Sequence, residues 1–180
     1  EDLLGKIGAL PLISVSQKPL PDFGKNTCIG DWGASEQHLF KQVLIGCEMA
    51  ETPYIITAEA DCLYPKEYFS PTFRMPDVGR YFMDNVWIFY PHSGLFYYKS
   101  ISDCAKVCDR IPFIDLLQRQ INGSVVPRHE EIRVPFAYPV INIKTGMGLR
   151  KHTQVSHAIP ARSSIEYWGT AEDVRRRVGL

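Results

Sequence analysis

Two carboxylates, Glu59 and Asp61, follow the short apolar run 54–58 with only Ala60 between them. In an extended segment, residues two apart point to the same side, so both side chains would face one ligand. Carboxylates beside a buried strand are costly unless they are paired or bound to a metal. Oxygen donors of this kind are preferred by Mg²⁺ and Mn²⁺. The pair therefore predicts a site for a hard divalent cation, with two solvated or capped loop acids as the alternative interpretation.

The segments before this pair read as strand, loop, helix and strand. A β-favouring run covers 12–16, and apolar residues at three- and four-residue steps indicate a helix over 35–51 that Pro53 ends. The run 54–58 fits a strand that is covered on both faces. This order predicts a βαβ unit with neighbouring parallel strands, whose ligands bind outside the carboxyl ends of the strands.

The rest of the chain mixes strands and helices. Residues 85–99 predict a hairpin around the turn Pro-His-Ser-Gly, and 138–144 predict a strand. Two helical pieces are expected over 103–110 and 112–121, and a short helix over 170–180.

Composition indicates a globular protein of one domain over residues 1–180. Lys and Arg balance Asp and Glu at 20 each, so net charge gives no general attraction to nucleic acid or anionic membrane. The five cysteines include no CxxC pair and are read as buried free thiols of a reduced compartment, which predicts a cytoplasmic protein. No apolar run is long enough to span a membrane.

Read from Gly30, the sequence GDWGASEQHLFKQVLIGCEMAETPYIITAEADCLYP resembles the family 2-like glycosyltransferases of the GT-A type, including glycosyltransferase-like proteins of bacteria and phages. The shared pattern is a Gly/Ser-rich turn, a helix, an apolar strand, a D-x-D motif and a following proline. It covers 11–69, and it departs from the family at Glu59, where the first acid is expected to be Asp, and at Ala60. The resemblance implies an α/β fold of the GT-A (Rossmann-like) kind, with a mixed, mostly parallel sheet flanked by helices.

The resemblance also implies an activity. A UDP-type nucleotide-sugar would donate its sugar to an acceptor hydroxyl, with inversion, and Mn²⁺ or Mg²⁺ would hold the diphosphate. By the family pattern the metal ligands are Glu59, Asp61 and a late histidine, His152, with His157 as second choice.

Further residues are assigned to the donor by the same resemblance or by their neighbourhood. The loop after the first strand would contact the nucleotide, and basic residues beside His152 would face the diphosphate. A loop tryptophan would stack on the sugar or the base. The donor-binding set is Ser14, Val15, Ser16, Lys18, Lys25, Asp31, Glu59, Arg150, Lys151 and Trp168. Surface lysines, a turn-forming aspartate and a core tryptophan are the alternative interpretations of its members.

An inverting transfer needs a general base for the acceptor hydroxyl. Asp103 fits the family position near the start of a helix after the central strands, and Asp84 is its rival. An acid at a helix N-terminus is also stabilised without any catalytic role.

Two other functions compete with the transferase. A degenerate, non-catalytic module that binds a nucleotide-sugar or glycan is supported by Ala60 and the short chain. A nucleotidyltransferase is less well supported, because the first loop lacks a glycine- and arginine-rich triphosphate fingerprint. The basic segment 144–180 favours an anionic acceptor, which is left open as a glycan, a nucleotide or a hydroxymethylated DNA base.

Overall fold

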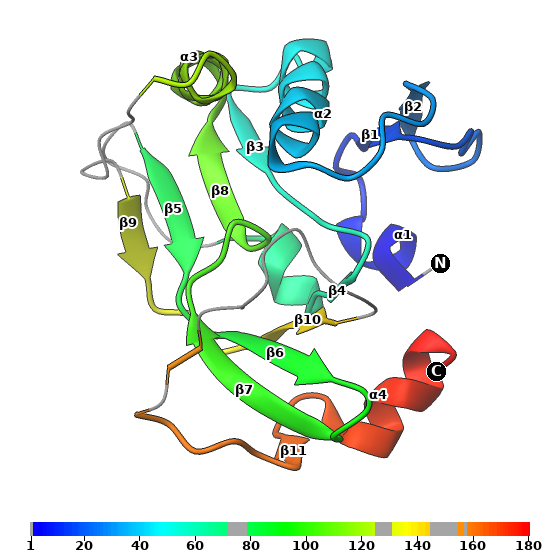
Figure 1. The fold of residues 1–180 in the computed structure, drawn as a ribbon, viewed down its shortest axis with the longest axis vertical. Helices are drawn as coiled ribbons and strands as arrows, with labels where there is room; N and C mark the ends of the chain where they lie inside the picture. Colours follow the sequence, from blue (N-terminus) through cyan, green and yellow to red (C-terminus); the bar gives the residue numbers. More distant parts are fainter. Residues whose placement is uncertain (1, 72–78, 125–130, 145–154, 157) are drawn as a thin grey trace. The chain divides into compact units, whose positions relative to one another are not determined.

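The computed structural model describes residues 2–71, 79–124, 131–144, 155–156 and 158–180. They form a mixed α/β fold (Figure 1). The chain divides into two compact units. Unit 1 comprises Glu1–Ile55, Arg74–Arg80 and Val107–Glu131, and unit 2 comprises Ile56–Phe73, Tyr81–Lys106 and Ile132–Leu180.

Unit 1 is built around two helices that lie side by side in Figure 1, α2 (Glu36–Met49) and α3 (Arg110–Ile121). The predicted helix α2 is confirmed, and Ser35 caps it by accepting a hydrogen bond from the His38 N–H at 3.1 Å. The apolar residues that these helices share are Cys47, Cys108, Phe113, Leu116 and Leu117. A short helix, α1 (Asp2–Ile7), precedes them.

The first strand does not pair as the βαβ prediction requires. Strand β1 (Ile13–Ser16) pairs in parallel with β2 (Lys25–Cys28) in a two-stranded sheet of their own. Strand β3 (Tyr54–Ile56) belongs to another sheet, with the order β3-β8-β5-β9. The prediction of neighbouring parallel strands on either side of α2 is therefore wrong, because the turn-rich segment after β1 contains a strand that takes the place of β3.

The sheet β3-β8-β5-β9 is completed by β8 (Lys106–Asp109), β5 (Arg80–Met83) and β9 (Glu131–Val134), and its residues belong to both units. A helix over 103–110 was expected here, and that prediction is wrong because 106–109 form β8. The four residues fill a strand between two others, where Val107 and Cys108 are fully buried. The second helical piece is confirmed as α3, with Pro112 in the first turn, where no N–H bond is lost.

Unit 2 contains the sheet β4-β10-β6-β7, formed by β4 (Cys62–Leu63), β10 (Val140–Ile143), β6 (Val86–Tyr90) and β7 (Leu95–Ser100). The hairpin β6–β7 is confirmed, and β10 runs parallel to β6 but antiparallel to β4. This sheet is mixed, so the expectation of a mostly parallel sheet is wrong. Pairing across the hairpin and β4 brings in antiparallel neighbours that the strand–helix–strand reading did not include.

The remaining elements of unit 2 are short. They are η1 (Lys66–Phe69), β11 (Ser164–Ile165), β12 (Gly169–Thr170) and α4 (Ala171–Val178). The predicted C-terminal helix is confirmed as α4, which begins with a capping box formed by Thr170 and Asp173. The core of this unit includes Phe89, Phe96, Ile141, Trp168 and Val174.

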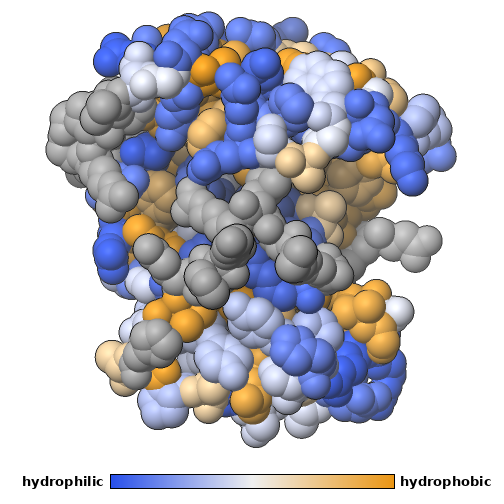
Figure 2. All heavy atoms as spheres, in the orientation of Figure 1, coloured by the Kyte–Doolittle hydropathy of each residue, from blue (hydrophilic) through white to orange (hydrophobic). Residues whose placement is uncertain are grey.

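In the part of the chain that the structure describes, no helix is both long and apolar enough to cross a bilayer. On the face shown in Figure 2, hydrophobic residues are scattered among hydrophilic ones.

Candidate functional site

Glu59 and Asp61 lie in unit 2, in the connection between β3 and β4. They do not continue the strand, because β3 ends at Ile56 and the Cys62 N–H donates to the Glu59 carbonyl at 3.2 Å, which closes a turn. The Ile143 N–H donates to the Asp61 carbonyl at 2.7 Å and fixes this turn to β10. The two acids are thus held close by a turn rather than by the alternation of an extended strand.

The Glu59 carboxyl group is perturbed electrostatically. Burial, followed by the charges of Asp61 and Asp103, raises its pKa from 4.5 to about 7, while the charges of Lys106 and Lys99 oppose the shift. The charges of two further carboxylates therefore act on Glu59 in this part of unit 2. Such a group of acids is relieved either by a proton on Glu59 or by a cation.

Two aromatic hydroxyls hold the segment around Glu59. The Tyr64 hydroxyl accepts the Glu59 N–H at 2.8 Å and donates to the Cys104 carbonyl at 2.8 Å. The Tyr68 hydroxyl donates to the Thr57 carbonyl at 2.7 Å. Both rings are buried and stack with their centroids 4.8 Å apart. Burial is the largest cause that raises the pKa of Tyr64 well above its ordinary value, so its hydroxyl stays neutral and keeps both bonds.

Two thiols, those of Cys62 and Cys104, adjoin the carboxylates, and the sequence analysis did not predict that they would meet. The adjacent Cys104 thiol, followed by burial, raises the pKa of Cys62 well above its ordinary value, and the Cys62 thiol donates to Asp61 Oδ1 at 3.7 Å. One ligand atom each of Glu59, Cys62 and Cys104 lies within 4.8 Å of the other two. The five cysteines are free thiols, but the reading of all of them as buried is wrong for Cys28, which is exposed, and holds only in part for Cys62; that reading also missed this cluster. Cys62 directly after the acidic pair was the available signal.

The two candidate bases are both engaged. The Lys106 ammonium donates to Asp103 Oδ1 at 2.6 Å, with the Asp103 side chain 67% exposed and that of Lys106 8% exposed. Asp103 precedes β8, not a helix, so stabilisation by a helix N-terminus does not explain it. The Asp84 carboxylate accepts the Phe136 N–H at 2.9 Å, which gives it a structural role. Of the two, Asp103 is the one that acts on Glu59.

The β1 residues predicted to bind the nucleotide-sugar belong to unit 1. The hydroxyl groups of Ser14 and Ser16 are hydrogen-bonded to Asn26 of β2 and to nearby backbone carbonyls. Asn26 Nδ2 on β2 donates to Ser14 Oγ at 2.8 Å and to Ser16 Oγ at 3.0 Å. Ser14 Oγ donates to the Phe23 carbonyl at 2.8 Å, and Ser16 Oγ donates to the Lys18 carbonyl at 2.6 Å. The sequence analysis did not single out Asn26, whose side-chain amide connects β2 to the two serine hydroxyls of β1.

The other unit 1 candidates differ in their surroundings. Asp31 Oδ1 accepts the Gly33 N–H at 2.9 Å, as a turn-forming aspartate does. Val15 is half-buried and faces Gly46 of α2, where an added Cβ would lie 3.6 Å from Val15 Cγ2. Lys18 and Lys25 are exposed.

The late candidates divide into two groups. Arg150, Lys151, His152 and His157 lie outside the described residues. Trp168 is 3% exposed in the core of unit 2, and its Nε1–H donates to the Pro139 carbonyl at 2.7 Å. Its faces are therefore occupied by the core, whereas the neighbouring Tyr167 is 39% exposed, with its ring centroid 5.8 Å from that of Tyr138.

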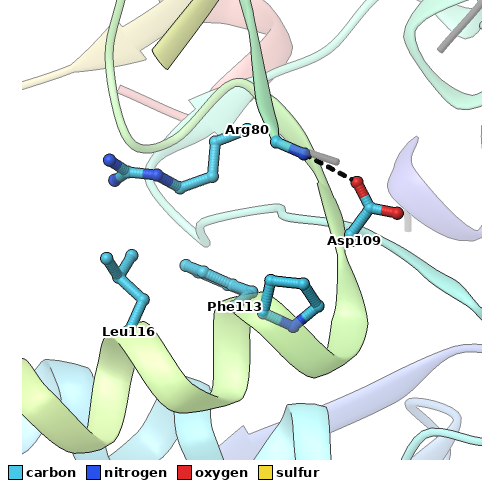
Figure 3. Close-up of a pocket in the computed structure, with 6 residues that line it drawn as sticks. Arg80, Asp109, Phe113 and Leu116 are labelled. Atoms are coloured by element: carbon cyan, nitrogen blue, oxygen red, sulfur yellow. Dashed lines mark hydrogen bonds between the residues drawn. The ribbon is translucent and has the colours of Figure 1, made fainter. Parts of the chain in front are cut away.

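A small hollow in unit 1 contains a further carboxylate (Figure 3). Arg80, Asp109, Phe113 and Leu116 line it, together with Gly79 and Pro112. Asp109 Oδ2 accepts the Gly79 N–H at 2.9 Å, and Arg80 pairs with Glu131 at 3.3 Å. These polar groups connect neighbouring strands, and the rest of the lining is apolar.

No family model, curated protein or solved structure matches the chain.

Proposed function

We propose that this chain is a metal-dependent glycosyltransferase of the GT-A type, which moves a sugar from a UDP-type donor to an acceptor hydroxyl with inversion. The observation that carries the proposal is the half-buried Glu59 carboxylate, whose pKa is raised by burial and by the charges of Asp61 and Asp103. A divalent cation would relieve that repulsion, and the oxygen donors fit Mn²⁺ or Mg²⁺. The order of helix, strand and acidic motif in the sequence is the second support.

Glu59 and Asp61 would hold the cation, with His152 as a further ligand. When bound, the cation supplies positive charge opposite the donor diphosphate. Arg150 and Lys151 would contact phosphate as point charges. Trp168 is not included in this proposal, because the core covers its ring.

Asp103 would act as the general base toward the acceptor hydroxyl. Its carboxylate is held by the Lys106 ammonium at 2.6 Å, and a carboxylate can accept the proton of an acceptor hydroxyl. Because its side chain is largely exposed, an acceptor can approach it while Lys106 keeps it oriented.

A non-catalytic binding module is the second candidate, and one observation favours it. The hydroxyls of Ser14 and Ser16 are already bound to Asn26 and to neighbouring carbonyls, which leaves them less available to a nucleotide. In this alternative the fold would bind a nucleotide-sugar or glycan without turnover.

Thermal unfolding with UDP, GDP, CDP and dTDP, each with and without Mn²⁺, tests the proposal. A ligand of the native state raises the melting temperature by mass action. The transferase account expects a metal-dependent rise with one nucleotide, lost in Asp61→Asn. Asp115→Asn is the matched control, because its carboxylate forms an exposed i,i+4 pair with Arg119 on α3. No rise with any nucleotide would contradict both candidates that bind a nucleotide-sugar.

Hydrolysis of the donor separates the two candidates. A transferase is expected to release UDP slowly from its sugar donor in the absence of acceptor, and Asp103→Asn should abolish that release. Metal-dependent binding without any release would support the binding module instead.

A further inference from the structure

Glu59, Cys62 and Cys104 bring three potential metal ligands together in unit 2. One donor atom of each lies within 4.8 Å of the others. Cys104 is 1% exposed and Cys62 is partly buried, so the two sulfur atoms are largely shielded from solvent. The cysteines come from segments far apart in the sequence, and only the folding of unit 2 brings them to the same carboxylate.

Hydrogen bonds fix the segments that carry these ligands. Tyr64 connects the Glu59 backbone to the Cys104 backbone through its hydroxyl group. Asn142 pairs with Cys62 across β10 and β4, and its Nδ2–H donates to Cys62 Sγ at 3.1 Å. An N–H donor directed at a cysteine sulfur is a typical outer contact of a thiolate ligand, because it stabilises the negative charge on sulfur. The Asn142 side chain is itself buried, at 7% exposure.

The donor chemistry selects the kind of cation. Mg²⁺ and Ca²⁺ take oxygen ligands, whereas Zn²⁺ readily combines cysteine sulfur with carboxylate oxygen. Three protein ligands are the number found in zinc sites that keep one position open for water or a substrate, while structural zinc sites usually have four. Two thiolates and a carboxylate would outweigh the charge of one Zn²⁺, and Lys106 and Lys99 lie near enough to act on the Glu59 charge.

We propose that Glu59, Cys62 and Cys104 form a three-ligand site for a thiophilic divalent cation, of which Zn²⁺ is the natural example. The site is independent of the transferase proposal, because it needs neither a nucleotide nor Asp61. It shares Glu59 with the oxygen-ligand site, so Zn²⁺ bound here competes with Mn²⁺ or Mg²⁺ for that carboxylate.

Cobalt absorption tests this site directly. Metal-free protein, kept under a phosphine reductant without oxygen, is titrated with Co²⁺ as a spectroscopic substitute for Zn²⁺. The expected result is a thiolate-to-cobalt charge-transfer band in the near ultraviolet, which saturates at one equivalent and disappears when Zn²⁺ is added. The band should be lost in Cys62→Ser and in Cys104→Ser, and it should persist in Cys28→Ser, whose thiol is exposed in unit 1.

A second measurement uses the wild-type chain, in case a cysteine variant fails to fold. Zn²⁺ should slow alkylation of Cys62, followed by mass spectrometry of peptides, and leave alkylation of Cys28 unchanged. No charge-transfer band in folded wild type, or a band that survives both cysteine substitutions, would overturn the proposal. So would zinc protection of Cys28 with none of Cys62.

Asp61→Asn separates this proposal from the transferase. It should abolish metal-dependent nucleotide stabilisation and leave the cobalt band intact. A cobalt band without nucleotide binding would support the thiolate site alone, and nucleotide binding without a band would overturn the thiolate site alone.

Discussion

The Glu59 N–H donates to the Tyr64 hydroxyl oxygen at 2.8 Å, and the same hydroxyl donates to the Cys104 carbonyl at 2.8 Å. One phenol therefore joins the acidic turn to the segment that carries the second cysteine. Both backbone groups depend on it, since Tyr64 is buried and no solvent replaces its oxygen.

Tyr64→Phe should destabilise the protein by about 2 kcal/mol, because a donor and an acceptor lose their partner in a buried place. Urea unfolding followed by circular dichroism measures the change. Tyr54→Phe is the control, since Tyr54 is 40% exposed, and it should leave the free energy of unfolding nearly unchanged. Equal stability of Tyr64→Phe and wild type would show that this hydroxyl does not hold the turn.

The raised pKa of Glu59 predicts a pH dependence of stability in chelator-treated protein. The folded state binds this proton more tightly than the unfolded chain, because the pKa rises from 4.5 to about 7 on folding. The raised pKa of Glu59 therefore leaves the free energy of unfolding unchanged below pH 4.5 and lowers it progressively as the pH rises from 4.5 to 7. Above pH 7 the loss levels off at no more than about 3 kcal/mol.

Glu59→Gln, which mimics the protonated side chain, isolates this effect. Its advantage in unfolding free energy over wild type should grow between pH 4.5 and 7 and then level off. An advantage that is the same at all pH values would contradict the assigned pKa.

Lys106→Met should raise the pKa of Glu59 further, because the Lys106 charge is the larger of the two that lower it. Carbon-13 NMR of labelled glutamate side chains follows the titration directly. Lys99→Met should give a smaller rise, since Lys99 acts more weakly on Glu59. A larger effect of Lys99→Met would show that the charges around the acidic turn are arranged differently.

Trp168→Ala should cost about 4 kcal/mol in unfolding free energy, because it removes a large ring from the core of unit 2 and leaves the Pro139 carbonyl without its donor. Tyr167→Ala, at an exposed neighbour, should cost less than about 1 kcal/mol. Denaturant unfolding of both variants checks the contrast. Wild-type stability of Trp168→Ala would show that the ring does not support the core, and Trp168 would again be a candidate ligand contact.

Local signals predicted several elements well. The helix α2 follows from apolar periodicity and the Ser35 cap, the β6–β7 hairpin follows from two apolar runs around a turn, and a short helix was expected where α4 forms. In each case the residues that specify the element are neighbours in the sequence, so short-range physics decides the outcome.

Pairing between strands that are far apart in the chain could not be predicted from the sequence. The four-residue spacing of Cys104 and Cys108 favours a helix, but β8 forms there because a place between β3 and β5 buries its residues. The β1–β2 pairing likewise depends on a turn-rich segment with little strand signal of its own. Glu59 and Asp61 were recognisable from the sequence, whereas the meeting of Cys62 with Cys104 depends on how unit 2 packs.

Calorimetric titration of metal-free protein with Mn²⁺ and with Zn²⁺, on wild type and Glu59→Gln, tests the central claim most directly. Glu59 is the one ligand shared by the oxygen-donor site and the thiolate site, and its neutral analogue keeps the volume of the side chain. The account predicts that wild type binds a divalent cation and that Glu59→Gln binds it at least tenfold more weakly, a loss of about 1.4 kcal/mol. Absence of binding in wild type, or equal affinity in the two proteins, would contradict a cation site at Glu59.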